Sequence, residues 1–217
     1  MAVWDWNYAF SILPALLEGL AITLLATVLG SIIAMLLGLV FAVLQRGPRL
    51  VAISVRGFVE FVRSTPLLVQ IFFLYFGLPA FGIVLPGLVV GVIALGVHYA
   101  CYTSEVYRAG IEAVPRGQWE AATALSLPRS RVWTGVVLPQ AVPRVVPALG
   151  NYVISMFKEV PLLIGIGILD VVGQAQEAGN TYFRYVEPYT LAGLFFLLLS
   201  YPASLLLRRL ERRVGSI

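Results

Sequence analysis

The chain has 217 residues, of which 59% are hydrophobic and 12% are charged, and its formal net charge is +4 at pH 7. The charged fraction is about half that of an ordinary soluble domain, which excludes a water-soluble globular protein. Its single cysteine, Cys101, excludes an internal disulfide and any metal site built from several cysteines.

The apolar runs of the chain predict transmembrane helices. They lack the alternation of outer-membrane barrel strands, and lipid leaves an open chain no other way to satisfy its backbone hydrogen bonds. A spanning helix needs about 20 mostly apolar residues. Five runs meet this requirement, at residues 20–44, 51–77, 87–107, 145–168 and 188–207. The sequence therefore predicts an all-α integral membrane protein, with residues 1–217 forming a single transmembrane domain.

The basic residues set the expected orientation. Twelve of the fifteen Lys and Arg residues lie around the first and third loops or in the tail, and only Arg184 falls clearly on the opposite side. Because cytoplasmic loops carry an excess of Lys and Arg, we expect the N-terminus outside and the C-terminus in the cytoplasm, as five spans require. This asymmetry accounts for the net charge without a nucleic-acid partner.

The longest cytoplasmic loop, residues 108–144, contains a predicted short helix. "EAVPRGQWEAATAL" (112–125) is rich in helix formers, and Pro115 can occupy its first turn. Trp119, Ala122 and Leu125 then share one face. "SLP" at 126–128 predicts the end of this helix. From the residues alone, such a helix either presents a rigid surface to a protein partner or rests on lipid.

Several motifs in this chain resemble those of a known family. Glu120-Ala121-Ala122, closed by Leu138-Pro139, resembles the EAA loop of bacterial ABC importer permeases. "VRSTPLLVQ" (62–70), "YRAGIEAVPRGQWEAATAL" (107–125), "LPQAVPRVVPALGNYVISMFK" (138–158) and the five-span layout look like the polar-amino-acid permeases. Within that group, "AVWDWNYAFSILPALLEGL" and "HYACYTSEVYRAGIEAVPRGQWEAATAL" look most like ectoine/hydroxyectoine permeases.

The resemblance implies the transmembrane domain of an ABC type I importer in the bacterial inner membrane, working by alternating access. The helix in the long loop would be the coupling helix that docks on a cytoplasmic ATPase. The residues carried over to this coupling role are Gly117, Glu120, Ala121, Ala122, Ser126, Leu138 and Pro139. The family usually has glycine where this chain has Ser126, and a different segment where this chain has "EVPL" at 159–162.

The resemblance also implies the partners and the solute class. We expect a second permease chain, either a similar one or a second copy, with two ATPase subunits and an extracytoplasmic solute-binding protein. The solute would be a small polar zwitterion, with ectoine or hydroxyectoine as the first expectation and a polar or basic amino acid as the alternative. An autonomous secondary transporter is less favoured, because the five spans show no internal repeat.

Nucleotide binding is not expected in this chain. Its only lysine, Lys158, follows Phe157, so no phosphate-binding loop of the Gly-Lys-Ser/Thr type exists. ATP and Mg²⁺ would therefore bind to the partner ATPase subunits. His98 is the only histidine, and no carboxylate or cysteine cluster has metal-ligand spacing. We expect neither an enzyme nor a metal site.

Polar residues near the middle of predicted spans are candidates for the solute path, because such residues tend to face a bundle interior or a water-filled cavity. They are Arg63, Thr65, Gln70, His98, Tyr102, Asn151, Ser155, Lys158 and Glu159. A purely structural role stays open for several of them: Arg63 can balance Glu60, and His98 can bond between helices. Pro161, followed by Gly165 and Gly167, predicts an interruption of the fourth helix, as in other transporters.

The longest predicted outer loop follows the fourth span. It carries the polar residues Asp170, Gln174, Glu177, Asn180 and Arg184. The resemblance makes this loop part of the docking surface for a solute-binding protein, while a merely solvated loop is the alternative.

Overall fold

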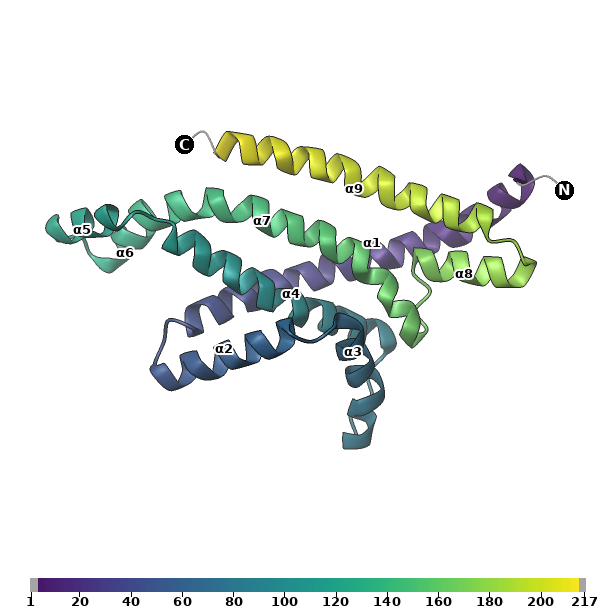
Figure 1. Cartoon of the computed structure of the whole chain (residues 1–217), viewed down its shortest axis with the longest axis horizontal. Helices are drawn as coiled ribbons and strands as arrows, with labels where there is room; N and C mark the ends of the chain where they lie inside the picture. The colour runs from purple at the N-terminus through teal and green to yellow at the C-terminus, as the bar shows by residue number, and fades with distance from the viewer. Residues whose placement is uncertain (1–3, 215–217) are drawn as a thin grey trace.

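The computed structural model describes residues 4–214 as helices joined by short turns (Figure 1). The α-helices are α1 (Trp6–Leu44), α2 (Arg49–Arg63), α3 (Leu67–Phe72), α4 (Gly87–Glu112), α5 (Arg116–Ala124), α6 (Arg129–Arg131), α7 (Leu138–Glu159), α8 (Val171–Tyr182) and α9 (Val186–Val214). Within the described residues, four helices are long and apolar enough to cross a membrane, and one bent pair makes a fifth candidate. The all-α class is confirmed, and the count of five spans holds if the bent pair is one span.

Helix α1 begins well before the predicted start of the first span. The side chain of Asp5 caps it by accepting hydrogen bonds from the backbone N–H groups of Asn7 (2.9 Å) and Tyr8 (3.3 Å). The helix then runs on through Pro14 to Leu44. The prediction from hydropathy began at residue 20 because it omitted the more polar first turns, which an N-cap nevertheless makes helical.

The second predicted span, 51–77, is not one straight helix. Helix α2 ends at Arg63, and α3 begins at Leu67 after Pro66. The chain bends by 104° at this break, and α3 continues through a π-helical turn, η1 (Phe73–Gly77), and a 3₁₀ turn, η2 (Leu78–Phe81). Pro66 explains the break, because proline donates no backbone N–H and disfavours the α conformation in the residue before it. Figure 1 shows the resulting arm leaving the bundle sideways.

Helix α4 lies at the centre of the bundle, where it packs against α1 and α7. Small residues in α1 allow this close approach. A Cβ atom at Gly30 would lie 2.8 Å from Sδ of Met156 in α7, and one at Gly38 would overlap Thr103 of α4. The Thr103 hydroxyl donates to the backbone oxygen of Ala34 at 2.8 Å. The spacing between the helices is therefore set by side-chain size.

The fourth predicted span also begins earlier than expected. Residues Arg129–Ile166 form one continuous helical stretch, in which a π-helical turn, η3 (Val132–Val137), joins α6 to α7. Pro143 and Pro147 lie inside α7 without ending it. The α-helix ends at Glu159, where Pro161 opens a 3₁₀ segment, η4 (Val160–Ile166), and Gly167 then adopts a left-handed φ of 78°. The predicted interruption of the fourth helix is confirmed.

The predicted outer loop is largely a helix, α8. Asp170 caps it by accepting from the backbone N–H of Gly173 at 2.8 Å, and the N–H of Val171 donates to Thr23 of α1 at 3.2 Å. Beyond α8, the fully buried Glu187 accepts from the N–H of Asp5 at 3.0 Å and from the Arg184 guanidinium. These contacts join the start of α1 to α8 and α9.

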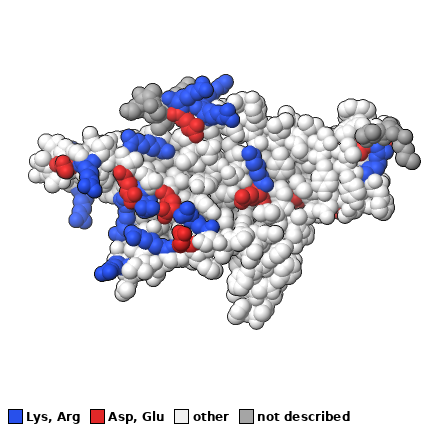
Figure 2. Space-filling model, in the orientation of Figure 1, with Lys and Arg blue, Asp and Glu red and all other residues white. Residues whose placement is uncertain are grey.

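Charged residues are concentrated at one end of the long axis (Figure 2). Lys and Arg gather around the end that holds α5 and α6, whereas most of the opposite half of this face is uncharged. This distribution agrees with the orientation expected from the loops. We accordingly call the end with α5 the cytoplasmic end and the end with α8 the outer end.

Candidate coupling surface and solute site

Helix α5 ends in a tight turn that fixes its direction. The N–H of Leu127 donates to the Ala122 oxygen at 3.1 Å, and the N–H of Ser126 donates to the Thr123 oxygen at 2.9 Å. These two bonds form a Schellman motif, whose turning residue has a left-handed backbone. Ser126 occupies that position with φ of 50°. The turn therefore keeps its shape although Ser replaces the glycine that is usual in the resembled family.

One face of α5 packs on the cytoplasmic ends of α4 and α7. Ala122 is 2% exposed, and the Trp119 and Trp133 rings meet edge to face with centroids 5.7 Å apart. Both tryptophans pack against a small apolar cluster that includes Val137. Leu125 was expected on this face but is 72% exposed, because it is the C-cap and the chain turns away there.

The opposite face of α5 is free in this chain. Gly117, Glu120 and Ala121 are exposed, as are Leu138 and Pro139 at the start of α7. Beside the turn, Trp119, Thr123, Ser126, Leu127, Arg129, Val132 and Trp133 line a hollow of about 510 Å³. Of the predicted coupling residues, only Ala122 points inward, so Ala122 sets the distance between α5 and its own chain.

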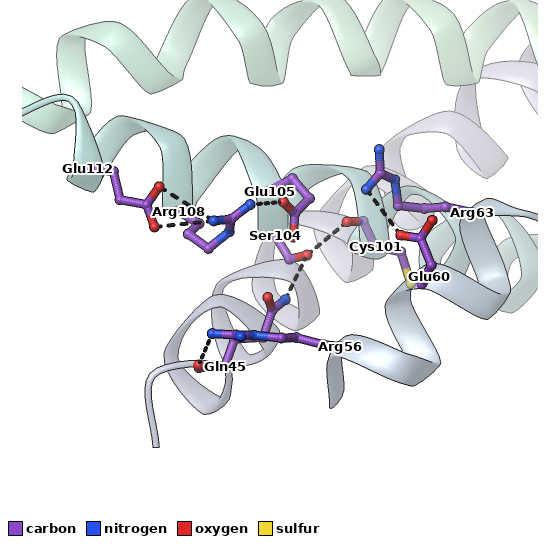
Figure 3. A network of polar contacts seen from close by, with 9 residues as sticks. All are labelled: Gln45, Arg56, Glu60, Arg63, Cys101, Ser104, Glu105, Arg108 and Glu112. Atoms are coloured by element: carbon purple, nitrogen blue, oxygen red, sulfur yellow. Dashed lines mark hydrogen bonds and ion pairs between the residues drawn. The ribbon is translucent and has the colours of Figure 1, made fainter. Parts of the chain in front are cut away.

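Polar contacts surround the connection from α4 to α5, and those within α4 are drawn in Figure 3. On the last turns of α4, Arg108 pairs with Glu105 and with Glu112, the latter at 3.2 Å between Nη1 and Oε1. Arg144 of α7 donates to the backbone oxygen of Ala113, in the connection from α4 to α5. The amide of Gln140 lies 3.4 Å from that of Gln118 on α5. The contact between Gln118 and Gln140 thus joins α5 to α7, and Arg144 joins α7 to the connection between α4 and α5.

Several predicted pathway residues meet where α2, α4 and α7 approach each other. The guanidinium of Arg63 lies 5.2 Å from the centre of the Tyr102 ring, a cation–π distance. The Tyr102 ring is 5.7 Å from that of Tyr152 and 6.2 Å from that of Tyr99. A cation at the end of α2 thus faces a group of three tyrosines from α4 and α7, which we call the tyrosine cluster.

Glu159 borders the tyrosine cluster at Tyr99. It is a charged neighbour of Tyr99, and its Oε2 atom is buried without a hydrogen-bond partner among the described residues. A buried acceptor without a partner is costly and is a candidate contact for a ligand. Arg63 thus borders the tyrosine cluster at Tyr102, and the Glu159 carboxyl group borders it at Tyr99.

The remaining pathway candidates divide into two groups. Gln70 and Thr65 bond each other at the bend after α2, and Nδ1 of His98 lies 3.1 Å from Oε1 of Gln70. Ser155 and Lys158 are exposed on α7. Asn151 is turned elsewhere, since its amide donates to Glu211 of α9 at 3.2 Å. The structure thus brings five of the nine together around the bend, with Glu159 beside them.

Sequence reasoning missed Tyr152 as a site residue. It precedes Glu159 by two helical turns on α7, so the two side chains share one face. Applying that spacing to the predicted acidic residue would have found it. The adjacent charged residues Lys158 and Glu159, by contrast, do not face the same surroundings, because neighbouring helical residues point in different directions. Lys158 is exposed, whereas one carboxyl oxygen of Glu159 is buried.

Comparisons with known proteins give a consistent result. The family model described as "Binding-protein-dependent transport system inner membrane component" matches residues 34–216. The chain is 49% identical over 202 residues to "Probable amino-acid ABC transporter permease protein y4tG" of Sinorhizobium fredii, covering 93% of this chain and 87% of the relative. It is 36% identical to the arginine transport system permease protein ArtQ of Bacillus subtilis, covering 98% of both.

A solved structure agrees with these relatives. The chain resembles a subunit in the "Crystal structure of an amino acid ABC transporter with histidines", with 35% identity, a TM-score of 0.91, and coverage of 98% of this chain and 100% of that one. These relatives are named for amino acids. They give no support to the narrower resemblance to ectoine permeases, and the alternative expectation of an amino-acid solute fits them better.

Proposed function

This chain belongs to the family of binding-protein-dependent transport system inner membrane components and is a permease subunit of an ABC importer, and we propose that its solute is an amino acid. Its relatives are translocation subunits, with the ATPase in a separate subunit. The family implies a multi-pass protein of the inner membrane that works with ATPase and binding-protein partners.

The placement of Arg63 and Glu159 around the tyrosine cluster carries the choice of solute. An α-amino acid has a carboxylate and an ammonium group on one carbon. The Arg63 guanidinium suits the carboxylate, because its planar donors match carboxylate geometry. The unpartnered oxygen of Glu159 suits the ammonium group, and the tyrosine faces suit a cation between them. The side chain of the solute would then decide affinity.

This chain supplies one wall of the proposed path. Two residues near Glu159 on α7 are exposed, namely Ser155 and Lys158. Polar side chains at membrane depth need a protein or water-filled surrounding. We therefore place a second permease chain, similar or identical, against this face, so that the two chains enclose the solute between them.

Coupling to ATP is assigned to the exposed face of α5. Glu120 would pair with a basic group of the ATPase, while the hollow beside Ser126 would receive an apolar side chain. ATP and Mg²⁺ would be bound by two ATPase subunits. Their closure would move α5, and through Gln118–Gln140 and the Arg144–Ala113 bond the motion would reach α7 and the end of α4. The spans would then alternate between inward- and outward-facing states.

The outer surface of α8 is assigned to the solute-binding protein. Gln176, Glu177, Asn180 and Thr181 border a hollow of about 410 Å³ there. Polar groups around a concave surface suit a partner that binds and releases repeatedly. Because the first N–H of α8, that of Val171, donates to the Thr23 hydroxyl of α1, docking on α8 would act on the first span.

The first test is gentle solubilisation of native membranes containing a C-terminally tagged chain, followed by identification of the proteins that co-purify. We expect a P-loop ATPase and a second five-span chain. The complex, reconstituted in proteoliposomes with its binding protein, would then be offered single amino acids and ectoine. ATP-driven uptake of an amino acid supports the proposal. Uptake of ectoine alone would reject the solute, and transport by the isolated chain without ATP would reject the coupling role of α5.

A further inference from the structure

The motif "VRSTPLLVQ" contains the bend between α2 and α3, where backbone groups lose their helical partners. The chain turns by 104° around Ser64, Thr65 and Pro66. Pro66 brings no N–H group to this turn. Backbone carbonyls left without a partner at membrane depth cost several kcal/mol each, so such a break needs other donors.

The side chain of Gln70 supplies donors here, in addition to the Thr65 N–H that lies 3.3 Å from the oxygen of Val62. Its Nε2 atom lies 2.7 Å from the oxygen of Val62 and 3.1 Å from that of Thr65. It also lies 2.7 Å from Oγ1 of Thr65, whose hydroxyl is itself 3.1 Å from the oxygens of Phe61 and Val62. One amide group of α3 therefore reaches back across the bend to the last turn of α2.

These contacts decide which way the Gln70 amide faces. Three oxygen atoms surround one end of the amide, and an oxygen there would face the two carbonyl acceptors, so that end must be the NH₂ group. Oε1 consequently points at Nδ1 of His98, at 3.1 Å. Since Oε1 only accepts, His98 must carry a proton on Nδ1 and donate it. His98 is 8% exposed in the centre of α4, so this bond ties the bend to the core.

Packing does not fix the bend from its other side. Phe58, Phe61, Val69, Phe73, Ile93 and Val97 are among the residues that line an apolar groove of about 370 Å³ in the angle between α2 and α3. No side chain of the described residues fills this groove. Core packing holds each arm separately, through Leu67 and Ile71 of α3 and through Val62 of α2 against Cys101, whereas on the open groove side the polar contacts of Gln70 join the two arms.

The bend also determines where Arg63 stands. Arg63 is the last residue of α2, directly after Val62, whose oxygen Gln70 binds. From there its guanidinium reaches the Tyr102 ring at 5.2 Å, while Tyr102 and His98 lie one turn apart on α4 with ring centroids 5.2 Å apart. The chain Val62–Gln70–His98 thus fixes α2 and α4 relative to each other beside the proposed carboxylate contact.

We propose that Gln70 is a positioning residue that locks the bend of the second span, with His98 orienting its amide, and thereby holds Arg63 at the tyrosine cluster. Its effect on transport rests on the proposed function, whereas the lock itself does not. Neither residue needs to touch the solute; for His98 this is the bond between helices that the sequence left open, whereas Gln70 was expected on the solute path.

The test measures the bend directly in the purified complex. Spin labels are placed on Leu50→Cys at the start of α2 and Phe81→Cys at the end of the arm, which are 82% and 76% exposed. Native Cys101 is fully buried and does not compete for the label. Labelled chain is diluted with unlabelled chain, so that pulsed electron paramagnetic resonance measures the distance between the two labels of one chain.

We expect a narrow distance distribution in the parent and a clearly broader one in Gln70→Leu and His98→Ala. His98→Asn restores a donor near the Nδ1 position and should restore the narrow distribution. Val69→Ala, a neighbour that is 56% exposed, serves as the matched control and should leave it unchanged. If Gln70→Leu does not fold, His98→Ala alone decides. An unchanged distribution in His98→Ala and in any folded Gln70→Leu would overturn the proposal.

Transport is read separately in proteoliposomes of the full complex. We expect about tenfold slower ATP-driven uptake for His98→Ala, the size of losing one buried hydrogen bond, and rescue by His98→Asn. If the variants broaden the spin-label distances but the parent complex takes up no amino acid, the proposed function is rejected and the role of Gln70 in holding the bend still stands. Normal uptake by a variant with a broadened bend would reject the link to Arg63.

Discussion

The guanidinium of Arg63 at the end of α2 lies 5.2 Å from the centre of the Tyr102 ring on α4, and it also lies 3.8 Å from the carboxylate of Glu60 on its own helix. The Glu60 side chain is 74% exposed, so this ion pair is weak and leaves the cation available. The contact places a cation beside the tyrosine cluster, which Glu159 borders at Tyr99.

Replacing Arg63 should impair uptake more than it impairs assembly. Arg63→Ala removes the proposed carboxylate contact, and a lost charged hydrogen bond of about 1.5–3 kcal/mol corresponds to roughly 10- to 100-fold slower uptake. Arg63→Lys keeps the positive charge but not the planar guanidinium, so its uptake rate should lie between those of the parent and of Arg63→Ala. ATP-driven uptake in proteoliposomes measures the effect. Arg49→Ala, exposed on the first turn of α2, is the control, and equal uptake by Arg63→Ala and Arg49→Ala would remove Arg63 from the site.

Glu159 should govern recognition of the ammonium group. Glu159→Gln keeps the shape and removes the negative charge, so we expect roughly tenfold or greater loss of amino-acid uptake. The loss should be smaller for a solute analogue that lacks the amino group, which is measured as inhibition of uptake by each compound. Glu18→Gln, an exposed carboxylate on α1, provides the comparison. Identical inhibition profiles in Glu159→Gln and the parent would show that Glu159 does not contact the solute.

Reversing the charge of Glu120 should uncouple the permease. Glu120 is exposed on α5, so Glu120→Lys should leave the fold and the membrane insertion unchanged. Because the substitution places a cation against a basic ATPase surface, we expect the ATPase to be lost on purification and uptake to be abolished. Glu177→Lys makes the same change on α8 and should retain the ATPase. Undiminished ATPase recovery and uptake in Glu120→Lys would refute the coupling role.

Glycine at position 126 should stabilise the turn after α5. A left-handed backbone costs an L-residue about 1–2 kcal/mol, which glycine avoids while it gains some freedom in the unfolded chain. Ser126→Gly should therefore raise the apparent melting temperature slightly and keep uptake normal. Ser130→Gly, inside α6, should lower it by the usual cost of helical glycine. A lower melting temperature for Ser126→Gly would mean that the Ser126 side chain itself stabilises the turn.

Asp170 should make the outer end sensitive to pH. Burial raises the pKa of its carboxyl group above the ordinary value, although the N–H groups of Gly173 and Val172 oppose this. The folded state thus holds the proton more tightly than the unfolded state, and stability is lost as pH rises through the raised pKa. Asp170→Asn keeps an N-cap acceptor and should abolish this loss. Thermal unfolding measured from about pH 4, near the unfolded pKa of Asp, upward to neutral pH tests it. If the melting temperatures of Asp170→Asn and of the parent fall equally as the pH rises, Asp170 is not the group responsible.

The spans and the coupling helix could be predicted because each depends on local pattern. Lipid demands long apolar helical runs, so the five candidate spans and the interruption near Pro161 are visible as composition. The turn after α5 could likewise be predicted from Ser126 and Pro128, because residues of these types end a helix by local effects that do not depend on the tertiary fold. The extra length of α1 and the helix α8 were missed, because the caps Asp5 and Asp170 make helical what hydropathy leaves out.

By itself, the sequence determined the class of protein and the family and predicted the orientation, because membrane insertion and family motifs depend on residues close together in the chain. The tertiary structure alone decided the angle of the bend after Arg63 and the meeting of Arg63 with Tyr102 and Tyr152. These contacts join three helices, and helix spacing depends on side-chain packing, such as that of Gly30 against Met156. Neither periodicity nor composition contains that spacing, so only the packed bundle shows which polar residues share a site.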